Sequence, residues 1–305
     1  MTERAVEIPL APPPGVPEER SHGGGDGLVV FSACCFGALP ILGESAYRSG
    51  MRLLPLLAWR FLMAAVLLWI LLGMSRRARR LPLPRVAGFL GMGVIYLIMS
   101  LLYFQALRYS PISTLTLIFY TYPALVTLLA AFVLKEALTR VKAAALILAL
   151  AGCILVLNPR EMGDGRGAAL AFAAAAIYSG YVLIGTRLTR GVDPLLASTW
   201  VLTTTTFLFV AIALGRGEMA PPRGPGAWGS LAGLAVVSTV VAEVAFFAGL
   251  PLTGASRAAI LSTVEPLFTL FLSALFLGEA IPAIRYVGGG VIVGSVLLLH
   301  RETRR

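Results

Sequence analysis

Hydrophobic positions along the chain fall into ten long runs that are separated by short polar stretches. The runs cover residues 28–47, 53–74, 86–107, 111–134, 141–157, 168–186, 195–214, 227–250, 255–277 and 281–299. Each run is close to the roughly 17–25 residues that an α-helix needs to cross the ~30 Å hydrocarbon core of a bilayer. Isolated strands would leave backbone groups unpaired in lipid, so the pattern predicts an all-α integral membrane protein with ten transmembrane helices.

The second half of the chain repeats the first. A shift of 143 residues aligns 104–156 with 247–299 without a gap, and places Pro123 on Pro266 and Glu136 on Glu279. Five spans per repeat is an odd number, so the second copy is inverted. We therefore expect two inverted five-helix repeats, an architecture typical of secondary transporters, which bind substrate at the repeat interface.

The expected boundaries follow from these runs. The first repeat covers 27–159, a Gly-rich linker covers 160–166, and the second repeat covers 167–300. Residues 1–26 are polar and rich in proline, which is typical of a disordered tail. Residues 301–305 form a short basic tail.

Charge is scarce and unevenly distributed. Charged residues make up 13% of the chain, against about 25% in soluble proteins. The net charge of +10 comes from basic residues in short loops, not from a basic stripe with aromatics, so no nucleic-acid partner is expected. One side of the predicted bundle carries 14 Lys and Arg and the other carries eight. The positive-inside rule then predicts that both termini lie in the cytoplasm. The expected location is the inner membrane of a bacterium.

Few residues suit catalysis or metal binding. The three cysteines, Cys34, Cys35 and Cys153, lie inside apolar runs, and the two histidines, His22 and His300, lie near the ends of the chain. No aspartate falls within the ten runs. These positions predict no disulfide framework, no metal site and no cofactor, and they argue against an enzyme.

Two pairs of segments carry a resemblance to a known family. They are Tyr-Pro-Ala-Leu-Val-Thr at 122–127 with Lys-Glu-Ala-Leu-Thr at 135–139, and Glu-Pro-Leu-Phe-Thr at 265–269 with Gly-Glu-Ala at 278–280. With ten spans in two halves, the chain resembles the drug/metabolite transporter superfamily, EamA type. The resemblance implies a secondary transporter that exports a small amphipathic metabolite, such as an amino acid. Phe36-Gly37 stands where many members have Trp-Gly.

Charged side chains inside the bilayer are costly, so each needs a partner or a function. Glu44 lies near the outer end of the first span and Arg60 about two turns into the second, so a structural ion pair is favoured over a substrate contact. Glu243 and Arg257 flank the turn between the eighth and ninth spans. They are expected to neutralise each other, either as an inner gate or as a staple of the hairpin.

Glu265 differs, because no basic residue is expected at its depth in the ninth span. Pro266 breaks the helix beside it, and Tyr122-Pro123 occupies the equivalent place in the fourth span. Paired breaks near the midplane indicate a transport site. Tyr120 and Tyr122 should point to different helix faces, so Tyr122 is preferred as a cavity residue, and Tyr178 is a weaker candidate.

Other interpretations remain open on the sequence alone. A channel, an integral-membrane enzyme, and a carrier of phosphorylated or nucleotide compounds are the alternatives to a metabolite exporter. The expected partners are a small-molecule substrate and the lipid bilayer. Gly290-x-x-x-Gly294 allows close helix packing, within the chain or in a homodimer. Glu136 and Glu279 are expected to cap the helices that follow them.

Overall fold

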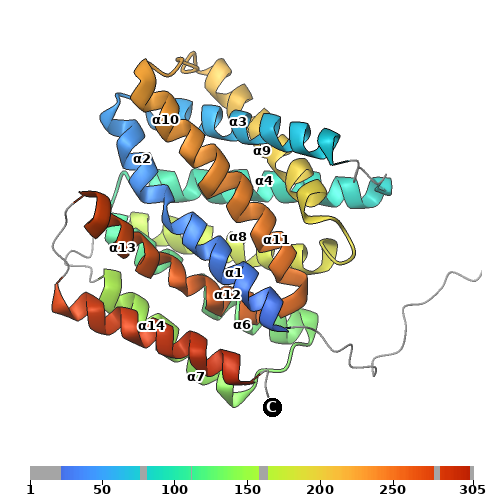
Figure 1. The fold of residues 1–305 in the computed structure, drawn as a ribbon, viewed down its shortest axis with the longest axis vertical. Coiled ribbons are helices and arrows are strands. Elements are labelled where there is room, and N and C mark those ends of the chain that lie inside the picture. The colour runs from blue at the N-terminus through green and yellow to red at the C-terminus, as the bar shows by residue number, and fades with distance from the viewer. Residues whose placement is uncertain (1–21, 76–80, 111, 158–163, 278–281, 303–305) are drawn as a thin grey trace, which may run out of the picture.

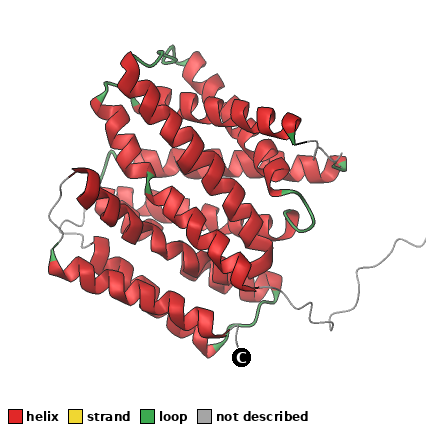
Figure 2. Ribbon diagram, in the orientation of Figure 1, coloured by secondary structure: helices red, strands yellow, loops and turns green. Residues whose placement is uncertain are grey.

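A computed structural model describes residues 22–75, 81–110, 112–157, 164–277 and 282–302 of the 305-residue chain, and these ranges contain helices and no strand (Figures 1 and 2). The first half contains α1 (His22–Gly37), α2 (Leu39–Arg48), α3 (Leu53–Met74), α4 (Leu83–Ala106), α5 (Ile112–Phe119), α6 (Tyr122–Leu129), a π-helical turn (Ala130–Leu134) and α7 (Arg140–Leu157). The second half contains α8 (Gly165–Leu188), α9 (Pro194–Gly215), α10 (Gly224–Ala235), a π-helical segment (Val236–Val241), α11 (Ala242–Thr253), α12 (Ala255–Leu261), a 3₁₀ turn (Ser262–Val264), α13 (Glu265–Leu277) and α14 (Ala283–Glu302).

These helices make ten stretches that are long and apolar enough to cross a membrane, counted over the described ranges. Spans one to ten are Gly24–Arg48, Leu53–Met74, Leu83–Ala106, Thr114–Leu134, Arg140–Leu157, Gly165–Leu188, Pro194–Gly215, Gly224–Thr253, Ala255–Phe276 and Ala283–Arg301. The predicted all-helical fold with ten spans is confirmed. Because the first helix begins at His22, span one includes Asp26, which corrects the expectation that no aspartate lies in a span.

The two halves interlock. Span one packs through α1 against α11 and α13 of the second half, and span six packs through α8 against α4 and α6 of the first half. Spans two and seven pack as α3 with α9, and spans five and ten as α7 with α14, which run side by side at the lower edge of Figure 1. The first span of each half thus contacts the third and fourth spans of the other, as an inverted repeat requires.

Four of the ten spans depart from a continuous, regular α-helix. Span one breaks at Ala38 and span four at residues 120–121, just before Pro123. Span eight contains the π-helical segment, and span nine contains the 3₁₀ turn just before Glu265 and Pro266. The two breaks predicted at symmetry-related positions in spans four and nine are present. Each lies just before a proline, which has no backbone N–H group to donate. π-helical segments are also frequent at functional sites.

Glycine brings spans five and ten into close contact. A Cβ atom at Gly152 would lie 2.9 Å from the Gly288 carbonyl oxygen, and one at Gly288 would lie 2.9 Å from the Gly152 carbonyl oxygen. Added Cβ atoms at Gly290 and Gly294 would have no described atom within 4 Å. The close approach inside this chain therefore uses Gly288, and the expectation of a homodimer stays a prediction.

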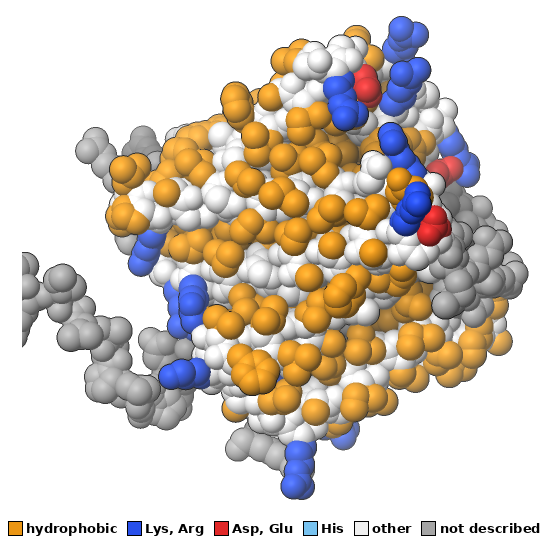
Figure 3. Space-filling view, turned by 180° about the vertical axis from the view of Figure 1, so that it is seen from behind, with side chains coloured by type: hydrophobic (Ala, Val, Ile, Leu, Met, Phe, Trp, Pro, Cys, Tyr) orange, Lys and Arg blue, Asp and Glu red, His pale blue; other side chains and the backbone are white. Residues whose placement is uncertain are grey.

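The outer surface suits a lipid environment. Large apolar side chains are exposed on many spans, including Phe132 (81% exposed) and Phe207 (71%). Figure 3 shows hydrophobic side chains spread across one face of the body, with Lys and Arg confined to its margins. Residues 22–26, which were expected in the tail, and residues 165–166, which were expected in the linker, are helical. Residues 1–21, 158–163 and 303–305 lie outside the described residues, so the disorder of the remaining tail and the rest of the linker stay predictions.

Candidate functional site

A cavity of about 350 Å³ lies between the two halves. Spans one, two, three, four, six, eight and nine all contribute lining residues. The cavity reaches the surface at one end of the bundle, where Glu44 and the 42% exposed Tyr47 line its mouth. We call this end of the bundle the mouth end, and the end that carries Asp26 the closed end.

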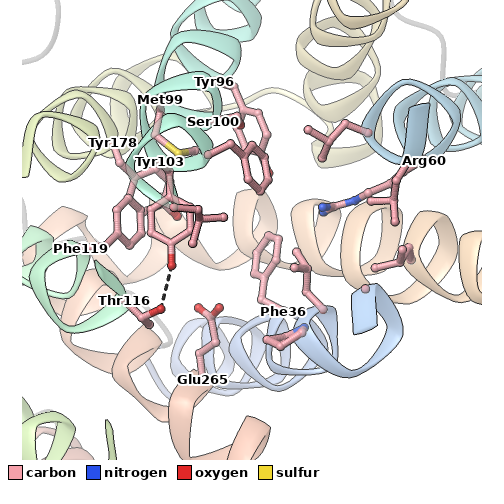
Figure 4. Close-up of a pocket in the computed structure, with 18 of the residues that line it drawn as sticks. Phe36, Arg60, Tyr96, Met99, Ser100, Tyr103, Thr116, Phe119, Tyr178 and Glu265 are labelled. Atoms are coloured by element: carbon pink, nitrogen blue, oxygen red, sulfur yellow. Dashed lines mark hydrogen bonds between the residues drawn. The ribbon is translucent and has the colours of Figure 1, made fainter. Parts of the chain in front are cut away.

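Aromatic rings form one wall of the cavity (Figure 4). Tyr178 of span six makes an edge contact with Tyr122 of span four, with ring centroids 4.9 Å apart. Phe119 lies 5.6 Å from Tyr178, again between centroids. The Tyr103 hydroxyl is held by Thr116 Oγ1 at 2.7 Å. Both expected residues, Tyr122 and Tyr178, therefore line the cavity, and they contact each other.

Glu265 lies at the base of the cavity, where the 3₁₀ turn gives way to α13. Its carboxyl group points into the cavity in Figure 4 and lies beside the Tyr120 hydroxyl. Span one supports the backbone at this point, because a Cβ at Gly37 would lie 2.9 Å from the Glu265 carbonyl oxygen. Thr269 also donates a hydrogen bond to the Gly37 carbonyl at 2.9 Å. The helix break thus presents a carboxylic acid on a closely packed support.

Tyr120 and Tyr122 both line the cavity, which corrects the expectation that only one of them could do so. Their ring centroids are 5.9 Å apart, and both side chains interact electrostatically with Glu265. The expectation assumed a continuous helix, in which residues two apart point to different faces. Span four is interrupted at residues 120–121, so that periodicity does not hold across the break.

A second cluster of polar side chains surrounds Arg60. The Arg60 Nε donates to Thr239 Oγ1 at 2.7 Å and Nη2 donates to the Ser238 carbonyl at 3.0 Å, so its partners come from the π-helical segment of span eight. Glu243, also on span eight, accepts a hydrogen bond from the Tyr181 hydroxyl. Arg60 and Glu243 interact electrostatically across the cavity wall, and both are almost fully buried.

The expected Glu44–Arg60 pair is absent. Glu44 accepts a hydrogen bond from Arg48 Nε at 2.9 Å, one helical turn along span one, and both side chains are largely exposed. Glu44 lies four residues from the end of its span, and Arg60 lies seven residues into the next. At 1.5 Å per residue their depths differ by about 4–5 Å, and Arg60 finds nearer partners in the second half.

The expected Glu243–Arg257 pair is also replaced. Span eight continues to Thr253, so Glu243 lies ten residues from its end, about 15 Å along the helix, whereas Arg257 is the third residue of span nine. The two residues therefore differ strongly in depth. Arg257 donates instead to Asp26, from Nε to Oδ1 at 2.7 Å and from Nη2 to Oδ2 at 2.5 Å.

Glu136 caps a helix, but not the one expected. Its two carboxylate oxygens accept hydrogen bonds from the backbone N–H groups of Ala255 (2.8 Å) and Ser256 (3.2 Å), at the start of α12 in the other half. The repeat-equivalent Glu279 lies outside the described residues. Sequence reasoning missed Asp26, which it placed in the tail, and it preferred Tyr122 over Tyr120. A buried arginine at the start of a span was the signal that an acid should lie nearby.

Comparisons with known proteins find one family model and several relatives that are named as transporters. A model of the EamA-like transporter family matches residues 23–158 and matches again over residues 165–301. The chain is 26% identical over 302 residues to a protein of Bacillus subtilis (strain 168) named "Uncharacterized transporter YcbK", covering 93% of this chain and 96% of that one. It is also 26% identical over 228 residues to "Uncharacterized transporter sll1319" of Synechocystis sp., covering 72% of this chain and 68% of the relative.

A solved crystal structure has the same fold. The two superpose with a TM-score of 0.80 over 93% of this chain and 99% of the other, at 22% sequence identity.

Proposed function

This chain belongs to the EamA-like transporter family, and we propose that it is a secondary transporter that exports a small amphipathic metabolite by alternating access. The observation that carries the proposal is the cavity between the interlocked halves, which opens at one end and holds Glu265 at a helix break. Its volume of about 350 Å³ lies within the range of small-molecule sites.

The lining residues support a cargo that carries an amino group, such as an amino acid or a related compound. Rings on several spans offer an apolar surface and can stack on a cation. The described lining residues include three carboxyl groups, those of Glu44, Glu243 and Glu265, and one basic residue, Arg60. Arg60 is already bound to span eight. The excess of acid disfavours a phosphorylated or nucleotide cargo and leaves Glu265 for an ammonium group or a proton.

The alternative classes fit the site less well. A channel needs a continuous polar path, whereas the described cavity ends at the packed helices of the closed end. An enzyme needs a nucleophile with an activating base, and the described lining residues offer hydroxyl and carboxyl groups but include no histidine or cysteine. The names of the relatives also favour transport over catalysis.

The location proposed is the inner membrane of a bacterium, with both termini in the cytoplasm. The excess of basic residues in loops at the closed end supports this orientation. The mouth of the cavity then faces away from the cytoplasm. An untargeted comparison of metabolites excreted by cells with and without the protein tests the export of an amine-bearing compound. Unchanged excretion under overexpression would contradict it.

Glu265 is proposed as the group that couples transport to a proton or to the cargo's ammonium group. Glu265→Gln keeps the shape and hydrogen-bonding capacity of the protonated acid but cannot exchange a proton. We expect it to abolish uptake driven by a pH gradient in proteoliposomes, with a normal gel-filtration profile. The control is Glu218→Gln, the same chemical change in a loop outside the cavity lining. Full gradient-driven uptake by Glu265→Gln would remove Glu265 from the coupling mechanism.

A further inference from the structure

The closed end of the bundle holds a buried ion pair that joins the two halves. Arg257 of α12 binds Asp26 of α1 through two hydrogen bonds of 2.7 and 2.5 Å, and only 5% and 7% of the two side-chain surfaces are exposed. His300 of span ten adds a third member, with its Nδ1 atom 3.4 Å from Asp26 Oδ2. The bidentate geometry is the strong form of an arginine–carboxylate contact.

A second contact between the halves lies beside the ion pair. Glu136, at the end of span four, accepts hydrogen bonds from the first two backbone N–H groups of α12. Gly254 makes the turn that precedes α12 with a φ of +81°, a conformation that disfavours other residues. A Cβ atom there would also lie 2.9 Å from Glu136 Oε1. Two carboxylates of the first half therefore hold the start of α12 in the second half.

These contacts lie between the cavity and the surface of the closed end. Asp26 and Tyr47 are 21 residues apart on span one, about 30 Å along a helix, so the ion pair and the mouth are at opposite ends of the same span. On span nine, Arg257 precedes Glu265 by eight residues, or about 12 Å. Span nine therefore runs from the ion pair to the base of the cavity, with the 3₁₀ turn between the two.

A buried ion pair suits a closure that has to open. Its charges attract each other strongly at low dielectric, but each gives up hydration, so the net gain over the separated and hydrated groups is small. Parting the halves would let water reach Asp26 and Arg257 together, which limits the cost of opening. Removal of one partner is different, because the remaining charge then favours a hydrated, open end.

We infer that the Asp26–Arg257 pair, supported by Glu136 on α12, is the closure of the cavity at this end, and that it separates when the cavity opens there. The inference rests on the alternating access proposed above. It assigns Asp26, Arg257 and Glu136 a gating role rather than a substrate contact. Because Arg257 and Glu265 share span nine, movement of α12 links the state of the cavity to the state of the closure.

The test measures access to the cavity from each side of the membrane and needs no substrate. A reporter cysteine, Ser262→Cys, lines the cavity and is introduced into the full chain with Cys34, Cys35 and Cys153 changed to serine. A membrane-impermeant maleimide is then applied to right-side-out and inside-out vesicles. With the ion pair intact, we expect labelling from the mouth end and slow labelling from the closed end.

Asp26→Asn and Arg257→Gln should each raise labelling from the closed end by about tenfold or more, and the exchanged pair Asp26→Arg with Arg257→Asp should bring it back down. Arg48→Gln breaks the exposed ion pair with Glu44 at the mouth end and is the matched control, with no change expected at the closed end. If the ion-pair variants do not fold, Glu136→Gln serves as a milder change that leaves no buried charge unpaired, and it should still accelerate labelling.

Unchanged labelling from the closed end in folded variants would overturn the inference. The ion pair would then be a purely structural contact between helices. Rapid labelling from the closed end with the ion pair intact would overturn it too. Neither result depends on the cargo, whereas a lack of metabolite transport by the unmodified protein would contradict the proposed function and leave this measurement intact.

Discussion

Arg60 lies seven residues into span two, and its hydrogen-bond partners belong to the other half of the chain. Its guanidinium group lies 5.0 Å from the centre of the Phe61 ring and interacts electrostatically with Glu243. Both charged residues are at least 96% buried. Removing either one leaves the other without its opposite charge in a medium of low dielectric, where an uncompensated charge is costly.

We therefore predict energetic coupling between Arg60 and Glu243. Arg60→Met and Glu243→Gln should each lower the stability of the purified protein, and the double variant should be less destabilised than the sum of the two. A double-mutant cycle in denaturant should give an interaction of about 1 kcal/mol or more. The same cycle on the exposed Glu44–Arg48 pair should give less than about 0.5 kcal/mol. Equal values for the two cycles would contradict this assignment.

The sequence identified the charged residues that matter but not their partners. The free-energy cost of placing a charged side chain in the bilayer drew attention to Arg60, Glu243, Arg257 and Glu265, and these residues are buried or line the cavity. Partners were assigned between consecutive spans, because loop length makes such spans neighbours. In the structure, Arg60 and Arg257 bind groups that are 178 to 231 residues away in the chain. Such contacts depend on how the halves interlock, which no local pattern encodes.

At the scale of elements, spans five and ten pack at Gly152 and Gly288, where the backbones approach too closely for a side chain. Gly288→Leu should force the helices apart and lower the yield of folded protein and its unfolding temperature. Gly290→Leu is the matched control, because it lies on the same helix at an exposed position with no described atom within 4 Å of an added Cβ. A thermal unfolding series in detergent measures both.

The two leucine variants test two different contacts of span ten. Equal unfolding temperatures for the two leucine variants would contradict the packing at Gly288. A change in oligomeric state confined to Gly290→Leu would support the predicted homodimer on that face.

The helices also show which structural features could be predicted from the sequence pattern. Ten spans and the two proline-linked breaks follow from hydrophobicity and from proline's missing donor, and the structure contains all of them. The π-helical segment of span eight has no proline and was not predicted, although it supplies the hydrogen-bond partners of Arg60. Helical periodicity failed at Tyr120 because the break in span four changes the direction of the residues that follow.

At the scale of the molecule, the orientation in the membrane can be measured directly. Reporter fusions after Gly217, in the loop at the mouth end, and at the C-terminus should report the outside and the inside of the cell respectively. The expectation rests on the excess of basic residues in the loops of the closed end. A C-terminus found outside would reverse the proposed orientation and make the mouth of the cavity face the cytoplasm.

The interlocked halves also have a consequence for how the protein is made. Asp26 leaves the ribosome before its arginine, which follows 231 residues later. At a synthesis rate of about 5–20 residues per second, about ten to fifty seconds pass between the synthesis of Asp26 and that of Arg257. During synthesis α1 cannot take its final place against α11 and α13 until these helices of the second half have been made. Helix α1 therefore completes its contacts late, after most of the second half has been made.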